Sequence, residues 1–148
     1  MLKRLWRRLA GRALGLQIVV SGNSMKPTFS DGDRAVVEPR RYRNGDPTRF
    51  DVVVVRPPGV DREDLKRIVG LPGELVEVRE GRLWIDGSVI DEPHLPGPMP
   101  ADWLHTWATR EREYVVLSDN RAAPGATDSR RYGPVSRTAI VGPVTRRA

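Results

Sequence analysis

The 148-residue chain contains no cysteine, which excludes disulfide bonds, thiol nucleophiles and zinc sites built from cysteine ligands. Its only histidines are His94 and His105, so a three-histidine metal site is excluded and a Ser-His-Asp triad would have to use one of them. Lysine is also rare, because 22 of the 25 basic residues are arginine. Arginine stays protonated in proteins, so an amine that acts as a general base would have to be Lys3, Lys26 or Lys66.

No run of uncharged apolar residues reaches the roughly 18 that a membrane-spanning helix needs. Residues 1–20 instead combine basic side chains with apolar ones at helical spacing, which predicts a basic amphipathic helix. Five of the six net positive charges lie in the first twelve residues, so the remainder of the chain is close to neutral. Such a helix suits an anionic membrane surface. The alternatives are packing against its own domain and nucleic-acid binding, although no nucleic-acid partner is expected. The segment lacks a small-residue cleavage site, so it is a poor fit to a removable signal peptide.

Beyond residue 20 the pattern changes to short apolar runs and period-two alternation, both typical of strands. A mainly β fold is therefore predicted, with strands at residues 35–37, 51–56, 65–69, 75–78, 82–85, 114–117 and 139–141. Residues 91–110 are rich in proline and carry Trp103 and Trp107, four positions apart. A short helix could present both rings on one side, where they would pack on the sheet or face a membrane or substrate.

Two residues of this chain suit nucleophilic catalysis without histidine. Ser24 lies in a turn sequence, where most serines have no chemical role, and a serine hydroxyl needs a neighbouring base to become a nucleophile. Alternation along residues 65–69 places Lys66 and Ile68 on one face of a strand. Burial would lower the pKa of the Lys66 amine so that it could accept a proton. Otherwise Lys66 would be a solvated lysine on an edge strand.

Four segments resemble, in order, the conserved boxes of the type I signal peptidase family, which includes bacterial leader peptidases and mitochondrial inner-membrane peptidases. They are residues 21–28 with Gly32 and Asp33, 49–54, 66–74 and 118–133. The resemblance runs from about Ser21 to Gly142. It implies a largely antiparallel β core over residues 21–148 with a small β extension over 75–113. It also implies a serine endopeptidase that needs no metal or cofactor.

The resemblance assigns Ser24 as the nucleophile and Lys66 as its general base, with the backbone N–H of Ser24 holding the oxyanion. Asp128 and Arg130 resemble the ion pair that supports the site in this family. The positions expected to support the two catalytic groups are Gly22, Asn23, Met25, Arg67, Asp119, Asn120, Arg121, Asp128, Ser129 and Arg130.

The chain departs from the family pattern at four positions. Gly22 stands where some members have a serine that assists the oxyanion, and Ala126 stands where a serine normally orients the lysine. We consider Thr127 or Ser129 as substitutes for that serine. Ser118 and Phe50 each replace a glycine, and the loop of residues 122–127 is longer than usual.

The function that the resemblance implies is cleavage of signal peptides from exported preproteins that carry small residues before the cut. The expected location is the outer face of the cytoplasmic membrane, with peripheral or weak anchoring. The alternatives are a maturation peptidase with one dedicated substrate and a catalytically silent homologue that acts as a binding protein. A self-cleaving regulator would need a DNA-binding domain, which twenty amino-terminal residues are too few to form.

Overall fold

The structure is a computed structural model that describes residues 2–4 and 15–146. Within these residues the chain forms twelve strands, one short α-helix and one 3-10 helix. The elements are β1 (Leu2–Arg4), β2 (Leu16–Val20), β3 (Arg34–Val37), β4 (Val52–Val55), β5 (Asp64–Gly70), β6 (Leu75–Arg79), β7 (Arg82–Ile85), β8 (Ser88–Ile90), β9 (His105–Ala108), β10 (Glu113–Leu117), α1 (Ser129–Tyr132), β11 (Val135–Ser136), η1 (Arg137–Ala139) and β12 (Ile140–Arg146).

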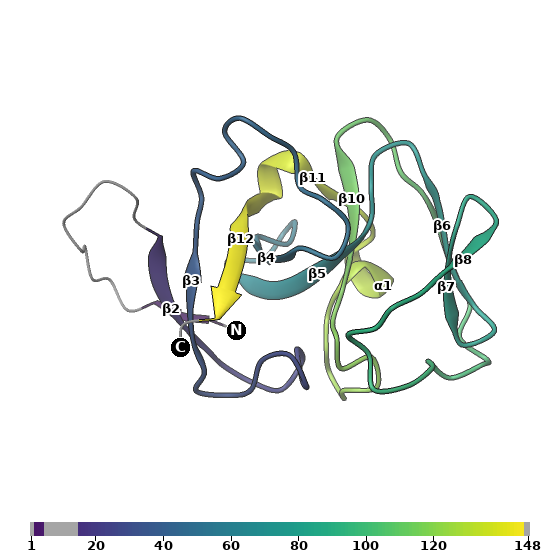
Figure 1. Cartoon of the computed structure of the whole chain (residues 1–148), viewed down its shortest axis with the longest axis horizontal. Coiled ribbons are helices and arrows are strands. Elements are labelled where there is room, and N and C mark those ends of the chain that lie inside the picture. The colour runs from purple at the N-terminus through teal and green to yellow at the C-terminus, as the bar shows by residue number, and fades with distance from the viewer. Residues whose placement is uncertain (1, 5–14, 147–148) are drawn as a thin grey trace.

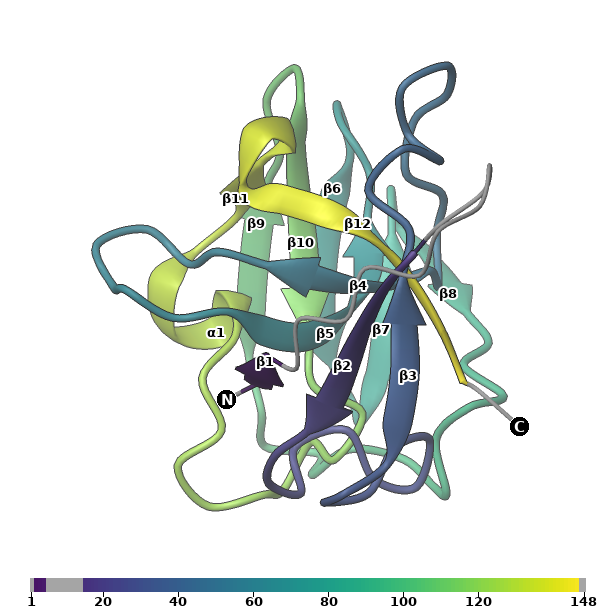
Figure 2. The ribbon, with the colours of Figure 1, turned by 90° about the vertical axis from the view of Figure 1, so that its left-hand side faces the viewer.

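Two antiparallel sheets contain all of these strands (Figures 1 and 2). The larger sheet has the order β1-β2-β3-β12-β4-β5-β10-β11, so β5 lies in its interior between β4 and β10. The smaller sheet has the order β8-β7-β6-β9 and occupies the right-hand side of Figure 1. Its strands come from residues between Leu75 and Ala108, which leave the larger sheet after β5 and return to it at β10.

The central strands β4 and β5 are buried along their whole length. The four valines of β4 are β-branched residues, which fit a strand that packs on both faces. Val53 of β4 pairs with Lys66 of β5, and Val54 pairs with Leu65. Lys66 therefore leaves the sheet on the side of Val53, and Leu65 on the opposite side.

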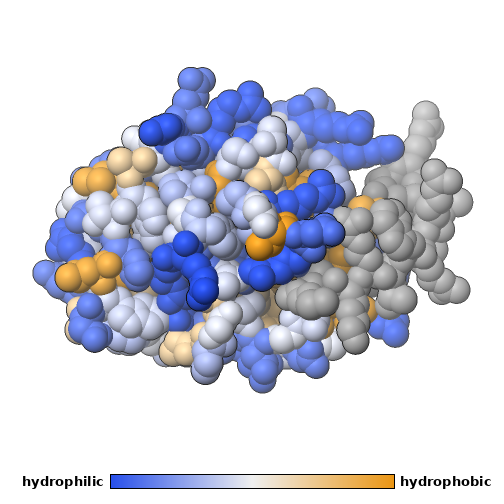
Figure 3. Space-filling view, turned by 180° about the vertical axis from the view of Figure 1, so that it is seen from behind, coloured by the Kyte–Doolittle hydropathy of each residue, from blue (hydrophilic) through white to orange (hydrophobic). Residues whose placement is uncertain are grey.

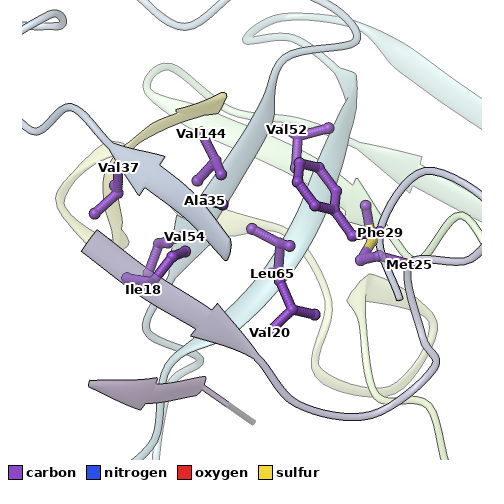
Figure 4. Close-up of a cluster of buried hydrophobic side chains, with 10 residues drawn as sticks. All are labelled: Ile18, Val20, Met25, Phe29, Ala35, Val37, Val52, Val54, Leu65 and Val144. Atoms are coloured by element: carbon purple, nitrogen blue, oxygen red, sulfur yellow. The ribbon is translucent and has the colours of Figure 1, made fainter. Parts of the chain in front are cut away.

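Three hydrophobic clusters pack around these sheets. The first gathers side chains of β2, β3, β4, β5 and β12 with Met25 and Phe29 from the turn after β2 (Figure 4). The second lies on the other face of β4 and β5 and includes Val53 and Ile68. The third joins the two sheets and includes Val69 and Val76. Seen from behind, the described surface is mostly hydrophilic with small, separate hydrophobic areas (Figure 3).

The prediction of a mainly antiparallel β fold is confirmed, and two local helix predictions differ from the structure. Residues 5–14 of the predicted amino-terminal helix lie outside the described residues, and the segments on either side are strands β1 and β2. Ile18 and Val20 alternate inward along β2, as expected for β-branched residues in a strand. The helix expected around Trp103 and Trp107 is wrong, because residues 105–108 form β9 and pair with β6.

Candidate active site

Ser24 lies in a tight turn that follows β2. The N–H of Lys26 donates to the carbonyl of Asn23 (3.2 Å), and that of Phe29 donates to the carbonyl of Met25 (2.8 Å). Met25 and Phe29 are only 1% and 3% exposed, and both belong to the first hydrophobic cluster (Figure 4). The turn is therefore anchored by its own apolar side chains while Ser24 remains half-buried at the surface of a cleft.

Gly22 begins this turn with a φ of 89°, a left-handed conformation that glycine adopts without steric cost. Its N–H donates to Oδ1 of Asp31 (2.8 Å). The backbone N–H of Gly22 is thus occupied. Among the described residues, no hydrogen-bond partner is found for the backbone N–H of Ser24.

Lys66 projects from β5 toward Ser24, 42 positions away in sequence. Its Nζ lies 3.3 Å from the Oγ of Ser24, which is within hydrogen-bonding distance. The Lys66 residue is only 3% exposed and β5 is an interior strand, so the alternative of a solvated lysine on an edge strand is wrong.

Burial is the main influence on the pKa of Lys66 and lowers it below the ordinary lysine value. The carboxylates of Asp64 and Asp128 oppose this decrease, and Arg62 and Arg130 add to it. The net effect is a lowered pKa. Compared with an exposed lysine, the site therefore shifts the Lys66 equilibrium toward the neutral amine, the form that can accept a proton from a hydroxyl.

Asn120 connects a second loop to the Ser24 turn. Its N–H donates to the carbonyl of Ser24 (2.9 Å), and its side-chain Nδ2 donates to the carbonyl of Asn23 (3.1 Å). These two bonds hold the peptide groups that precede and follow Ser24.

A buried ion pair lies beneath the same turn. Nε and Nη2 of Arg67 lie 2.8 and 2.7 Å from the two carboxylate oxygens of Asp119. Arg67 also donates to the carbonyl of Phe50 (2.8 Å), and Thr28 of the turn donates to Asp119 (2.5 Å). Arg67 and Asp119 are 7% and 1% exposed. Lys66 and Arg67, adjacent on β5, thus serve opposite faces: one approaches Ser24, and the other supports the turn that carries it.

Asp128 caps helix α1 and pairs with Arg130. Its carboxylate accepts hydrogen bonds from Nε and Nη2 of Arg130 (2.9 and 2.7 Å), from the N–H of Arg130 (3.0 Å) and from the N–H of Ser118 (2.9 Å). Burial alone would raise the pKa of Asp128, but these bonds and the charge of Arg130 lower it below its ordinary value. Arg130 also donates to the carbonyl of Arg121 (2.8 Å), so the pair links the start of α1 to the loop that contains Asn120.

Arg121 points away from the Ser24 turn. Its Nη2 lies 2.6 Å from Oε1 of Glu92, and its Nε donates to the carbonyl of Ser118 (2.6 Å). The side chain therefore connects the 118–121 loop to the segment between β8 and β9. Sequence reasoning did not identify Glu92. Burial would raise the pKa of this carboxyl, but the imidazole of His94, 3.5 Å away, and the hydrogen-bonded guanidinium of Arg121 lower it.

The positions that depart from the family pattern have distinct structural settings. Phe50 has a φ of 71°, so this site uses the left-handed conformation for which glycine is the usual residue. The Oγ of Ser129 accepts the N–H of Val116 (2.9 Å), and the hydroxyl of Thr127 accepts a hydrogen bond from Arg62. Both hydroxyls proposed as substitutes at the Ala126 position are thus engaged with partners other than Lys66.

Ser24 and Lys66 open into a cleft of about 710 Å³. Other residues that line it include Gly22, Asn23, Lys26, Arg62, Asp64, Asn120, Ala126 and Thr127. Arg62 and Asp64 were missed in the sequence. The period-two spacing of Arg62, Asp64 and Lys66, which places all three on one side of an extended strand, is the signal that could have revealed them.

Residues 2–4 and 15–146 contain no group of three or more histidine or carboxylate side chains arranged to hold a metal ion. In the same residues, no helix has the length and apolar character required to cross a membrane.

Comparisons with known proteins agree on one family. The family model described as signal peptidase, peptidase S26, matches residues 10–147. Signal peptidase I of Leptolyngbya laminosa is 33% identical over 144 residues, which cover 88% of this chain and 70% of that protein. Signal peptidase I V of Bacillus subtilis is 31% identical, with 90% and 85% covered.

A probable signal peptidase I-2 of Synechocystis is 33% identical over 129 residues. That match covers 83% of this chain but only 58% of the Synechocystis protein. Among solved structures, a signal peptidase I from Enterococcus faecalis matches with a TM-score of 0.60 and 31% identity, over 68% of this chain and 97% of that one.

Proposed function

Because the chain belongs to the signal peptidase family, peptidase S26, we propose that it is a serine endopeptidase that removes signal peptides from exported preproteins. The observation that carries the proposal is the approach of the buried Lys66 amine to Ser24 Oγ at 3.3 Å, inside the cleft. A serine beside a base with a lowered pKa is the arrangement that nucleophilic catalysis requires.

In the proposed reaction, neutral Lys66 takes the proton of Ser24 while Oγ attacks the scissile carbonyl. The backbone N–H of Ser24 stabilises the oxyanion that forms. Protonated Lys66 then gives its proton to the leaving amine, and an acyl-enzyme ester remains on Ser24. A water molecule, deprotonated by Lys66, hydrolyses the ester and regenerates the free serine.

The residues around the two groups have positioning roles in this proposal. Asn120 fixes the peptide on either side of Ser24, so that Oγ and the backbone N–H keep their relative orientation. Arg67 and Asp119 hold the turn from below through Thr28. The Asp128–Arg130 pair holds the loop of residues 118–121.

We further propose that the chain acts at the outer face of the cytoplasmic membrane, where exported preproteins emerge. The support is the sequence of residues 1–12, which concentrates five basic side chains among apolar ones. Sedimentation with vesicles of anionic lipid, compared with vesicles of neutral lipid, tests this part. Binding that requires the anionic lipid and disappears when these five residues are changed to glutamine supports it, and equal binding to both vesicles contradicts it.

The peptidase proposal is tested with the purified full chain and a preprotein in detergent micelles. We expect one cut after a small-x-small sequence, read from the mass of the new amino terminus, and no cut with Ser24→Ala. A matched Ser30→Ala variant, changed at a neighbouring serine, should cleave as the wild type does. No cleavage by a folded chain across several preproteins would contradict general signal-peptide removal and would favour a dedicated substrate or a silent homologue.

A further inference from the structure

Arg62, close to Lys66 in the sequence, forms an ion pair on its own segment and a hydrogen bond to a distant loop of the cleft. Arg62, just before β5, has its Nε 3.0 and 3.1 Å from the two carboxylate oxygens of Asp64. Its Nη2 donates to the hydroxyl of Thr127 in the 122–127 loop. All three residues line the same cleft as Ser24 and Lys66. Arg62 thus links the strand that carries the amine to the loop on the opposite wall.

The position of Asp64 creates a problem for the proposed base. Asp64 pairs with Val55 and Lys66 pairs with Val53, so both side chains leave the same side of β5 about 7 Å apart. The Asp64 side chain is only 6% exposed. A buried carboxylate at this distance from an amine favours the protonated amine and competes with Ser24 as its partner. Arg62 counters both effects because it binds the carboxylate and adds a positive charge.

We propose that Arg62 is a positioning residue for the reaction: it keeps the Asp64 carboxylate directed away from the Lys66 amine and fastens the 122–127 loop to the cleft wall. The inference rests on the proposed function of Ser24 and Lys66. This role of Arg62 also explains how Lys66 stays near Ser24 although Ala126 replaces the serine that usually orients the lysine. Arg62 binds the Asp64 carboxylate, which would otherwise compete with Ser24 for the amine.

Several other charged groups face Lys66 and must stay constant in a test. Asp128 favours the charged form of Lys66, and Arg130 disfavours that form. Asp128 and Arg130 are paired with each other at the start of α1. Lys26 lines the same cleft from the Ser24 turn. The Tyr132 hydroxyl, on the same side of β5, has its pKa raised by burial and by Asp64 and Asp128, so it stays neutral. Asp128, Arg130, Lys26 and Tyr132 are unchanged in every variant of the experiment.

The test is the titration of Lys66 in the full chain and in Arg62→Gln. The chain has three lysines, so NMR with isotope-labelled lysine resolves them, and Lys66→Ala assigns the signal. We expect the midpoint of Lys66 to rise by about one pH unit in Arg62→Gln, as expected for a unit charge at this distance in a partly exposed site. The midpoint of the pH–activity profile should rise equally, with kcat at the alkaline plateau largely retained.

Two further variants separate this role from simple structural support. Arg62→Gln with Asp64→Asn should bring the Lys66 midpoint back toward the wild-type value, because both charges are then removed. Arg62→Lys keeps the charge without the paired donors and should give an intermediate midpoint. Arg41→Gln is the matched control, because Arg41 forms its own exposed ion pair with Glu38 and is remote from the cleft. It should leave the titration unchanged.

An unchanged Lys66 midpoint in a folded Arg62→Gln variant would overturn the proposal. So would a loss of activity that is equal at every pH and is not rescued by Asp64→Asn. The NMR titration does not depend on turnover. If the wild-type chain cleaves no preprotein, the proposed function fails, while the titration still decides whether Arg62 separates Asp64 from Lys66.

Discussion

The Arg67–Asp119 ion pair predicts a large and specific loss of stability when one partner is removed. Both residues are almost fully buried, and their side chains form two direct bonds with each other. Replacing Asp119 with alanine would leave the Arg67 guanidinium buried without its counter-charge. Removal of one partner from a buried pair costs about 3–5 kcal/mol, a large part of the roughly 5–15 kcal/mol of a typical domain.

Urea unfolding at neutral pH measures this loss for Asp119→Ala, with linear extrapolation to water. The matched control is Arg56→Ala, because Arg56 and Glu63 form an ion pair in which the Arg56 side chain is 57% exposed. Its removal should cost less than about 1 kcal/mol. Arg67→Met combined with Asp119→Ala should lose less stability than Asp119→Ala alone, since no charge is then left buried. A loss of about 1 kcal/mol or less for Asp119→Ala would refute the reasoning, because the pair would then behave like an exposed one.

Three further predictions follow from the same structure. Asp128→Asn should cost about 1–3 kcal/mol at neutral pH and flatten the acid limb of the stability curve. The pKa of Asp128 in the folded protein lies below its ordinary value of 3.8. The contribution of Asp128 to the free energy of unfolding is therefore complete above about pH 4 and is lost as the pH falls through the folded pKa. Urea midpoints measured at several acid pH values would reveal this loss. Gly70→Ala should lower the free energy of unfolding by about 1–3 kcal/mol in thermal or urea unfolding, because the new Cβ would lie 2.5 Å from Val76 and 3.0 Å from Val115. Gly45→Ala, where the new Cβ would lie in open space, should be nearly neutral. Equal effects of the two substitutions would contradict the packing around Gly70. Preprotein cleavage should rise from neutral to mildly alkaline pH as Lys66 loses its proton, and full activity at mildly acidic pH would contradict its role as the base.

The strands that position the site could be predicted from local sequence. The valines of β4 and the alternation around Lys66 indicate buried strands, and the structure has them as β4 and β5. The apolar spacing of the basic amino terminus predicts a helix that continues to Val20, where the structure has strand β2. The run from Gln17 to Val20 contains three consecutive β-branched residues, and its inward positions have period two.

The contact between Ser24 and Lys66 could not be derived from local pattern, because it joins segments 42 positions apart. Only the resemblance of the whole set of boxes to a family brought the two residues together in the sequence analysis. The Arg62 pair was missed for a related reason. A charged residue before a strand is normally a solvated end, and its role becomes visible only when the 122–127 loop is placed beside it.

The most direct test of the Ser–Lys assignment is acylation of the protein itself. The chain would be mixed with an activated ester of a short peptide that ends in alanine, quenched with acid and mapped by mass spectrometry at a series of pH values. Among the hydroxyl groups of the chain, we predict an acyl ester on Ser24 alone, formed faster as the pH rises from neutral to alkaline and absent in Lys66→Ala. Acylation of Ser24 at an unchanged rate in Lys66→Ala, or an ester on another hydroxyl in place of Ser24, would contradict the assignment of Ser24 as the nucleophile and Lys66 as its base.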